Sequence, residues 1–459
     1  MSAAMDAPIH ASAPNLEDLQ TIIRDYLHEE RFEKVRTLLD TMHPAEIAAL
    51  MTGLGSTERH YVFDMTSEEV QHDVLIELEE PDQERLLDRL EDERIIEILH
   101  NLESDDATDV VALLDEPTRE RVLQASEQKD REELEELLAY EEDTAGGLMA
   151  LEVVTVFENK TVHDGIEMVR TAKEHGHEDI HYIYVIDRNK TLKGRIAIID
   201  LMLAPRSQSV LEILDDEMIV IQRDTDQEEV AQIFSRYDLI AAPVVDEDYC
   251  LIGRITIDDI VDVMAEEAEE DIAKMAGTGE ETVSERNLLI TIRARLPWLI
   301  LALFGEMGGA FVLSQFEESL TTLIVIAFFI PTIIALAGNV GIQCSTIVVR
   351  GLATGDIHSN RMFRRVGREV VVASVNGLIL SILLMLVVYL WKGDWVIGIA
   401  ISLSLISVVI VSALVGSLTP FLLKKMNQDP ALAAGPFITM TNDVVGLTIY
   451  LLITSSMLS

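Results

Sequence analysis

The stretch GPFITMTNDVVGLTIYLLI (435–453) decides the fold class of the C-terminal part of the chain. It is apolar over a length that crosses a bilayer, and its only formal charge is Asp443. A charged side chain at bilayer depth costs about 2.5–3.5 kcal/mol on insertion scales, so such a residue marks a functional site by default. The alternative interpretation is a carboxyl group hydrogen-bonded between packed helices.

Apolar stretches long enough to span a membrane follow Arg295. There are five, at about 296–315, 320–349, 369–391, 395–423 and 432–457. Basic residues gather before the first stretch, between the second and third, and between the fourth and fifth, whereas the alternate loops hold one Lys between them. The positive-inside bias therefore predicts a cytoplasmic N-terminus, five crossings and an extracytoplasmic C-terminus.

The second of these stretches contains IPTIIALAGNVGIQCS (330–345), with Pro331, Gly338, Asn339 and Gly341. We expect this span to be interrupted, because backbone freed from helical hydrogen bonds at bilayer depth lies where protein or a water-filled path satisfies it. A proline kink with small residues for close packing is the alternative. Carboxylate, carbonyl and amide oxygens favour a hard cation such as Mg²⁺, although sodium and calcium fit the same donors.

The part before the first membrane stretch is strongly acidic. The chain has a net charge of −45, yet only eight of its 80 acidic residues, Glu306 among them, follow Thr291. A polyanion of this kind repels phosphates, which excludes nucleic acid as a partner. Cys250 and Cys344 are too few for a disulfide framework. The opening residues lack the basic flank and apolar core of a signal peptide.

Residues 15–140 have the pattern of short amphipathic helices, many of which begin at favourable N-cap or first-turn residues. Helix starts recur about every 11–14 residues, which predicts a superhelical stack of helices. No residue in this part has the pattern of a catalytic group.

An internal repeat follows: VIDRNKTLKGRIAIIDLM (185–202) matches VVDEDYCLIGRITIDDIV (244–261) at a constant offset of 59 residues. Each copy predicts a strand, a turn, a strand and a helix, preceded by a further strand and helix. This pattern resembles a tandem pair of CBS domains. The resemblance implies one module formed by two similar copies.

Some CBS domains hold an adenosine ribose with a Gly-x-x-Thr/Ser-x-x-Asp ending. Gly253, Thr256 and Asp259 match this ending in the second copy, whereas the first copy has Ala197 in place of the hydroxyl residue. The resemblance therefore implies one nucleotide site, with ATP as a candidate ligand, or a CBS pair that binds no nucleotide.

The stretch IDDIVDVMAEEAEEDIAKMAG (257–277) predicts an acidic helix that leads toward the first membrane stretch. Its spacing places Asp259, Asp262, Glu266 and Glu270 along one helix edge. Like charges stacked in this way destabilise the helix unless cations neutralise them. A solvated helix face is the alternative.

The order of these parts resembles the MgtE family of magnesium channels over nearly the whole chain. The resemblance is carried by YEEDTAGGLM (140–149), DTDQEEVA (224–231), YDLIAAPVVDE (237–247), GNVGIQ (338–343) and DPALAAGPFITMTNDVVGLTIY (429–450). We expect a disordered N-terminus at 1–14, a helical domain at 15–140, CBS domains at 141–204 and 205–264, a connecting helix at 265–292 and a membrane domain at 293–459.

The resemblance implies a homodimer in the lipid bilayer of the plasma (inner) membrane, with one pore on its two-fold axis and Mg²⁺ as both substrate and regulator. The pore residues that it implies are Asp443, Thr439, Gly435 and Asn339. The regulatory carboxylates that it implies are Asp226, Asp238, Asp259, Asp262, Glu267, Glu270 and Asp271, with a partner in the helical domain at Asp106 or Asp109.

Other functions make different demands on the sequence. A transporter of another divalent cation, or a cation–proton exchanger, stays open as an alternative. An intramembrane metalloprotease with CBS domains needs H-E-x-x-H, and HEERF at His28 lacks the second His. A nucleotide-driven pump needs the Gly-Lys pair of a phosphate loop, which the chain lacks. A CBS-regulated chloride channel would carry more spans and a cationic path. We therefore expect a transport protein and no enzyme.

Overall fold

The computed structural model describes residues 16–177, 180–276, 288–322, 324–353, 362–426, 428–433 and 435–458. The predicted N-terminal tail at 1–14 and the part of the predicted connecting helix at 277–287 lie outside the described residues. The chain divides into two compact units, Met1–Val263 and Met264–Ser459, and each unit is described by itself. The finer domain boundaries stay predictions.

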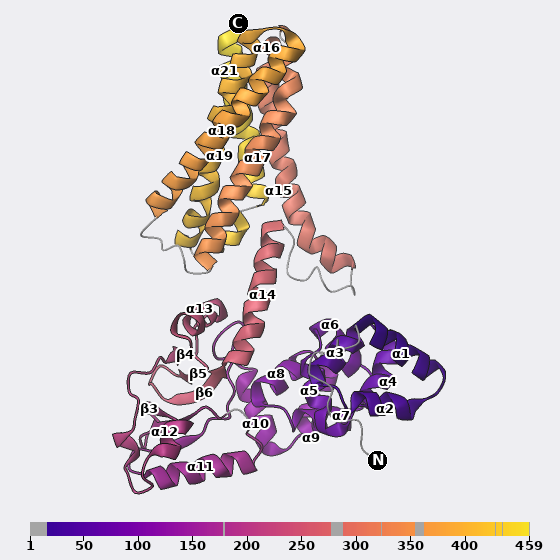
Figure 1. Cartoon of the computed structure of the whole chain (residues 1–459), viewed down its shortest axis with the longest axis vertical. Coiled ribbons are helices and arrows are strands. Elements are labelled where there is room, and N and C mark those ends of the chain that lie inside the picture. The colour runs from indigo at the N-terminus through magenta and orange to yellow at the C-terminus, as the bar shows by residue number, and fades with distance from the viewer. Residues whose placement is uncertain are drawn as a thin grey trace, which may run out of the picture. The chain divides into compact units, whose positions relative to one another are not determined.

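The first unit begins with a stack of short helices, as the sequence predicts (Figure 1). They are α1 (Leu16–His28), α2 (Phe32–Leu39), α3 (Pro44–Thr52), α4 (Ser56–Met65), α5 (Gln71–Ile76), α6 (Glu80–Leu87), α7 (Asp92–Leu99), α8 (Ser104–Ala112), α9 (Glu116–Ala125) and α10 (Gln128–Leu137). Their apolar faces form one continuous core that runs from Ile23 to Leu134. Each helix is short, so this shared core and not helix propensity stabilises the stack.

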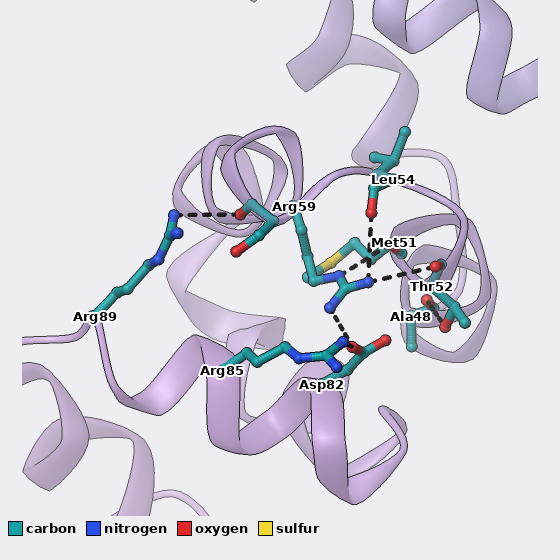
Figure 2. A network of polar contacts seen from close by, with 9 residues as sticks. Ala48, Met51, Thr52, Leu54, Arg59, Asp82, Arg85 and Arg89 are labelled. Carbon is teal, nitrogen blue, oxygen red and sulfur yellow. Dashed lines mark hydrogen bonds and ion pairs between the residues drawn. The ribbon is translucent and has the colours of Figure 1, made fainter. Parts of the chain in front are cut away.

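A buried ion pair links α4 to its neighbours in this stack (Figure 2). Arg59 is 6% exposed and donates through Nε to Met51 O at 3.1 Å, while its Nη2 reaches two more carbonyl groups near the end of α3. Its Nη1 donates to the Asp82 carboxylate of α6, which also accepts from Arg85 Nη1 at 3.0 Å. The guanidinium group is therefore buried with acceptors for its donors, the condition under which a buried charge is tolerated.

Two CBS-like copies follow and confirm the predicted repeat. The first has β1 (Thr155–Phe157), α11 (Val162–Glu174), β2 (Tyr182–Ile186), β3 (Leu192–Ala197) and α12 (Ile198–Leu203); the second has β4 (Ile221–Gln222), α13 (Gln227–Tyr237), β5 (Ala241–Val245), β6 (Leu251–Thr256) and α14 (Ile257–Ala276). In each sheet the first strand is parallel to the second, and the second is antiparallel to the third. Val185 pairs with Gly194 and Val244 with Gly253, so the strand register repeats at the predicted offset.

The β-turns of the two copies pair with each other. Leu192 N donates to Tyr249 O at 3.0 Å, and the equivalent Leu251 N donates to Lys190 O at 3.2 Å. Lys190 and Tyr249 have φ values of 64° and 65°, which confirms that the two turns adopt the same left-handed backbone. These reciprocal bonds, with an apolar cluster shared by β2 and β5, join the copies into one module.

The second unit holds the C-terminal half of α14 and a bundle of long helices (Figure 1). The bundle contains α15 (Leu288–Gln315), α16 (Glu317–Thr322), α17 (Ile324–Ala353), α18 (Met362–Lys392), α19 (Trp395–Lys425), α20 (Pro436–Thr441) and α21 (Leu447–Leu458). Among the described residues, five helical segments are long and apolar enough to cross a membrane, at 291–315, 324–352, 362–392, 395–425 and 437–458. The five predicted spans are confirmed, and α19 has the largest buried share of the five.

The predicted interruption of the second span is wrong. Helix α17 is continuous from Ile324 to Ala353, with Pro331 inside it. A Cβ atom at Gly416 of α19 would lie 2.3 Å from Gly341 O, so the glycines serve a close helix crossing. The alternative interpretation, a proline with small residues for packing, is therefore the correct one. The break in helical structure lies in the last span instead.

Substituting Arg59 by Met tests the buried ion pair. The change leaves the Asp82 carboxylate buried with Arg85 alone, and the loss of one partner of a buried pair costs about 3–5 kcal/mol. We expect the free energy of opening of α3 and α6, measured by amide hydrogen exchange in the full-length chain, to fall by about this amount. Arg89→Met is the control, because exposed Arg89 makes one 3.4 Å bond to Ser56 O. Equal losses in the two variants would argue against the prediction.

Candidate functional site

The last span changes its helical geometry around Asp443. Gly435 has φ −96° and ψ −118°, outside the helical region, and the short helix α20 follows it. Residues Asn442–Gly446 then form a π-helical turn before α21 begins. Asp443 lies inside this turn and is 7% exposed. A π-helical turn holds one extra residue and is frequent at functional sites.

Contacts with α17 and α19 hold this turn in place. Asn442 Nδ2 donates to Ala337 O of α17 at 3.4 Å, and Ser412 Oγ of α19 donates to the same carbonyl. A Cβ atom at Gly341 would lie 2.6 Å from Ile438 Cγ2, so α20 lies directly against α17. The three helices therefore fix the backbone on either side of Asp443.

A second carboxylate lies beside Asp443. The Glu306 side chain of α15 is hydrogen-bonded to the Asp443 side chain. Next to it, a Cβ atom at Gly308 would lie 3.0 Å from Val444 Cγ2, and one at Gly309 would lie 3.8 Å from Asp443 O. The sequence reasoning assigned Glu306 no role, although a lone charge within an apolar span was a sufficient signal.

The other predicted pore residues lie on the surface of the single chain. Thr439 is exposed on α20, one turn before Asp443, and Asn339 is exposed on α17. Gly435 contributes backbone only, at the start of α20. Thr439 and Gly435 therefore precede Asp443 within the last span, whereas Asn339 belongs to α17.

A cluster of carboxylates joins α8 to the second CBS copy within the first unit. Burial, and the nearby Asp259 carboxylate, raise the pKa of Asp105 well above its ordinary value. Burial, and after it the nearby Asp259 carboxylate, also raise the pKa of Asp106 to about 7. Burial raises the pKa of Asp259 to about 6. The predicted partner Asp106 therefore lies near Asp259, and the sequence reasoning missed the buried Asp105.

Two polar contacts hold α8 beside these carboxylates. Arg254 of β6, 5% exposed, donates through Nη2 to both oxygens of Glu103, at 2.7 and 2.8 Å. Ser104 Oγ donates to Glu152 at 2.7 Å and accepts from Leu151 N at 2.8 Å. The positive charge of Arg254 and the hydrogen bonds of the Ser104 hydroxyl group therefore offset part of the repulsion between the carboxylates.

The remaining predicted regulatory residues of the first unit are spread out. Asp226 caps the start of α13, where its Oδ1 accepts from Glu228 N at 3.0 Å, and Asp238 ends the same helix with a φ of 50°. A helix of this length separates them by about 18 Å, so one ion cannot bridge them within one chain. Asp109 and Asp262 are exposed.

The three residues of the predicted nucleotide site form a closed turn. Both N and Oγ1 of Thr256 donate to Asp259 Oδ2, at 3.1 and 2.8 Å. A Cβ atom at Gly253 would lie 2.7 Å from Met149 Sδ. Met149 therefore packs directly against the backbone of this turn.

A second acidic group lies in the second unit, where the C-terminal half of α14 meets Asp429. Burial, with Asp429 and Glu267 close by, raises the pKa of Asp271 to about 6. Lys274 Nζ contacts the carboxylates of both Glu270 and Asp429, the latter at 2.8 Å. The predicted residues Glu267, Glu270 and Asp271 are thus brought together, and Asp429 and Lys274 were missed. The Asp-Pro pair at 429–430, which favours a turn start, was the available signal.

No group of three or more His, Cys, Asp or Glu side chains is placed to hold a metal ion in the part of the chain that the structure describes. The carboxylates lie near one another in pairs and loose clusters.

Five apolar spans, carboxylates inside the first and last of them and a CBS pair with acidic surroundings are the features of a cation transport protein. The comparisons with known proteins agree with this class. The chain belongs to the MgtE family. Its residues 42–143 match the MgtE intracellular N domain, 210–266 match the CBS domain, and 330–453 match the MgtE model described as a divalent cation transporter.

Similar proteins cover nearly the whole chain. The magnesium transporter MgtE of Thermus thermophilus is 34% identical over 440 residues, which is 95% of this chain and 97% of the relative. The magnesium transporter MgtE of Bacillus subtilis is 30% identical over 92% of this chain and 94% of its own. The crystal structure of the cytosolic domain of the Mg²⁺ channel MgtE in complex with ATP is 35% identical, with a TM-score of 0.50, over 53% of this chain and 99% of that one.

Substituting Asp106 by Asn tests the repulsion at α8. The folded-state pKa of about 7 lies above the ordinary value of 3.8, so the folded chain holds a proton that the unfolded chain releases between these values. Stability therefore falls as pH rises through this window, and the full cost is present above about pH 7. Without metal, we expect Asp106→Asn to raise the unfolding temperature of the first unit at about pH 8, by about 2–4 °C per kcal/mol relieved, and to give a clearly smaller gain at about pH 5, where only part of this window has been crossed.

Scanning calorimetry of the full-length chain in a chelator measures both values. Glu120→Gln is the control, because it neutralises an exposed carboxylate of α9. A gain that is the same at both pH values, or shared by the control, would contradict the assignment.

Proposed function

We propose that this chain conducts Mg²⁺ across the plasma membrane along a path at Asp443. The buried carboxylate inside the π-helical turn carries this proposal. Mg²⁺ dehydrates reluctantly and is usually held by one or two carboxylates with several waters kept, so sparse carboxylates in a membrane suit it. The relatives that align over 92% and 95% of the chain, named as magnesium transporters, support the same substrate.

The pore residues that we propose combine charged and neutral oxygen donors. The hydrogen bond between the Asp443 and Glu306 side chains requires one proton, so the pair supplies one charge in this arrangement and a second when the proton leaves. Thr439 offers a hydroxyl oxygen, Gly435 a backbone carbonyl and Asn339 a side-chain amide. Two neighbouring carboxylates repel when both are ionised, so an entering cation relieves that repulsion.

We propose a homodimer, which doubles the few carboxylates of one chain around a single pore. Support comes from an exposed apolar face in the CBS pair. Ile199, Met202 and Leu203 of α12 are 61%, 70% and 77% exposed. Burial of this face against a second copy removes it from water. The basic residues of the loops support a cytoplasmic N-terminus and an extracytoplasmic C-terminus.

We propose that cytoplasmic Mg²⁺ closes the path by bridging the acidic groups. Without metal, the carboxylates near Asp259 and those near Asp271 repel and favour a separated, conducting arrangement. Each bound ion shifts the equilibrium toward the closed arrangement by its differential affinity for the two states, and several ions make the response steep. A nucleotide such as ATP belongs to this proposal as a ligand of the CBS pair, because the cytosolic domain of a related channel was crystallised with ATP.

Removing the carboxylate of the proposed pore tests the path. A hydrogen bond or contact to a charged group is worth about 1.5–3 kcal/mol, so we expect Asp443→Asn to lower Mg²⁺ conduction about tenfold or more, with the dimer intact. Glu306→Gln should lower conduction by a smaller factor and weaken the preference for Mg²⁺ over Na⁺. Mg²⁺ flux into proteoliposomes, with and without a proton gradient, measures both and separates conduction from proton exchange.

Glu317→Gln is the matched control, because Glu317 is an exposed carboxylate on α16. Native flux in Asp443→Asn would remove the pore assignment. Native flux and selectivity in Glu306→Gln would remove the role of Glu306 alone.

Neutralising Asp259 and Asp262 together tests regulation. The double change to Asn removes two carboxylates that repel without metal and bind Mg²⁺ with it, so we expect conduction to persist while inhibition by internal Mg²⁺ weakens. Flux at increasing internal Mg²⁺ measures the effect. The control neutralises Glu132 and Glu135, two exposed carboxylates of α10. Native sensitivity in the double variant would contradict this part of the proposal.

A further inference from the structure

Lys274 lies where the proposed regulatory carboxylates of the second unit converge. It is near the end of α14, and its ammonium group contacts Glu270 one turn earlier and Asp429 Oδ2 at 2.8 Å. The contact with Asp429 links α14 to a segment more than 150 residues further along the chain. A basic side chain therefore occupies the space between carboxylates to which the proposed function assigns Mg²⁺.

The position of this ion pair distinguishes it from a surface pair. The side chains of Lys274 and Asp429 are 23% and 31% exposed, whereas Lys129, which forms an (i, i+4) pair with Glu133 at 3.2 Å, is 76% exposed. The partial burial of Lys274 and Asp429, and the additional contact of Lys274 with Glu270, favour an ordered ion pair. Exposed single ion pairs, in contrast, contribute little to stability.

Asp429 connects this contact to the last span. Its other oxygen, Oδ1, accepts from Ala431 N at 2.7 Å and so fixes the start of the 3₁₀ turn Pro430–Ala433. Ala431 is fully buried, and this turn packs against α19. The chain then runs through Gly435 and α20 into the π-helical turn. A force on Asp429 therefore acts on the segment that carries Asp443.

More carboxylates than ammonium groups meet at this contact. One ammonium group faces the carboxylates of Glu270 and Asp429, and the pKa of Asp271 nearby is raised by burial and by Asp429. A divalent ion brings twice the charge of a lysine and accepts more oxygen ligands. The lysine bridge is consequently weaker than a metal bridge between the same groups.

We infer that Lys274 is a built-in cation of the gate, which bridges Glu270 and Asp429 when no Mg²⁺ is bound there and keeps the channel partly closed. This inference rests on the proposed function. Mg²⁺ takes over the bridge at higher concentration and completes closure. The chain thus limits Mg²⁺ entry even when the cytoplasm holds little of it.

Lys274→Gln tests the inference in the full-length channel. We expect its open probability to rise about two- to fivefold when the cytoplasmic face is bathed in a chelator, the range that one partly buried ion pair supplies. In saturating cytoplasmic Mg²⁺ it should close as fully as the native channel, because the metal replaces the lost bridge. Inside-out membrane patches, with Mg²⁺ as the current carrier in the pipette, measure both conditions.

Lys274→Arg should behave as native, because it keeps the charge, and Lys129→Gln is the matched control for loss of an (i, i+4) pair. If Lys274→Gln fails to assemble, Lys274→Ser, which also removes the ammonium group and keeps every carboxylate, should show the same rise in the chelator. An unchanged open probability in the chelator overturns the inference. A native channel that cytoplasmic Mg²⁺ does not inhibit overturns the proposed gating instead, so the two failures are distinguishable.

Discussion

Repulsion between carboxylates held close together is the interaction on which this structure depends. It occurs where α8 meets the second CBS copy, at Asp106 and Asp259, and again where α14 meets Asp429. It occurs a third time inside the membrane, between Glu306 and Asp443. Burial makes each of these arrangements costly, because a charged group loses water. A cation lowers the cost in every case, so the proposed conduction and the proposed regulation depend on the same kind of interaction.

The chain supplies some of the required positive charge itself. Arg254 holds Glu103 with two short bonds, and Lys274 lies between Glu270 and Asp429. These fixed cations position the acidic groups without neutralising all of them. The remaining negative charge is available to an ion from solution, and its binding free energy depends on how far apart the carboxylates lie. The proposed sensing of Mg²⁺ and the stability of the fold therefore depend on the same residues.

Sequence patterns that depend on neighbouring residues predicted much of the fold. The CBS repeat was predicted because Val185 and Val244 begin matching segments, and the strand register confirms it. The five spans were predicted from hydropathy, which is likewise local. The interruption of α17 was predicted wrongly, because Pro331 and the nearby glycines are the same signal for a broken helix and for a close helix crossing. Only the position of α19, whose Gly416 lies against Gly341, distinguishes a broken helix from a close helix crossing.

Contacts between distant segments account for what the sequence reasoning missed. Glu306 and Asp443 belong to the first and last spans, and Lys274 and Asp429 are similarly far apart. No periodicity in one helix reports on such a pair. The resemblance implied Asp106 or Asp109 of the helical domain as the partner of the regulatory carboxylates. It gave no sign of Asp105, whose burial near Asp259 is evident only from the packing of α8.

The π-helical turn at Asn442–Gly446 makes the last span sensitive to its length. Each residue of an α-helix turns the chain by about 100°, so losing the one extra residue of the turn would rotate everything that precedes it relative to α21 by that angle. Tyr450 anchors α21 through a hydrogen bond from its hydroxyl to Ile326 O at 2.8 Å, and α20 is held against α17. Both ends are fixed, so insertions and deletions of single residues should be rejected here during evolution even where the substituted side chains remain apolar.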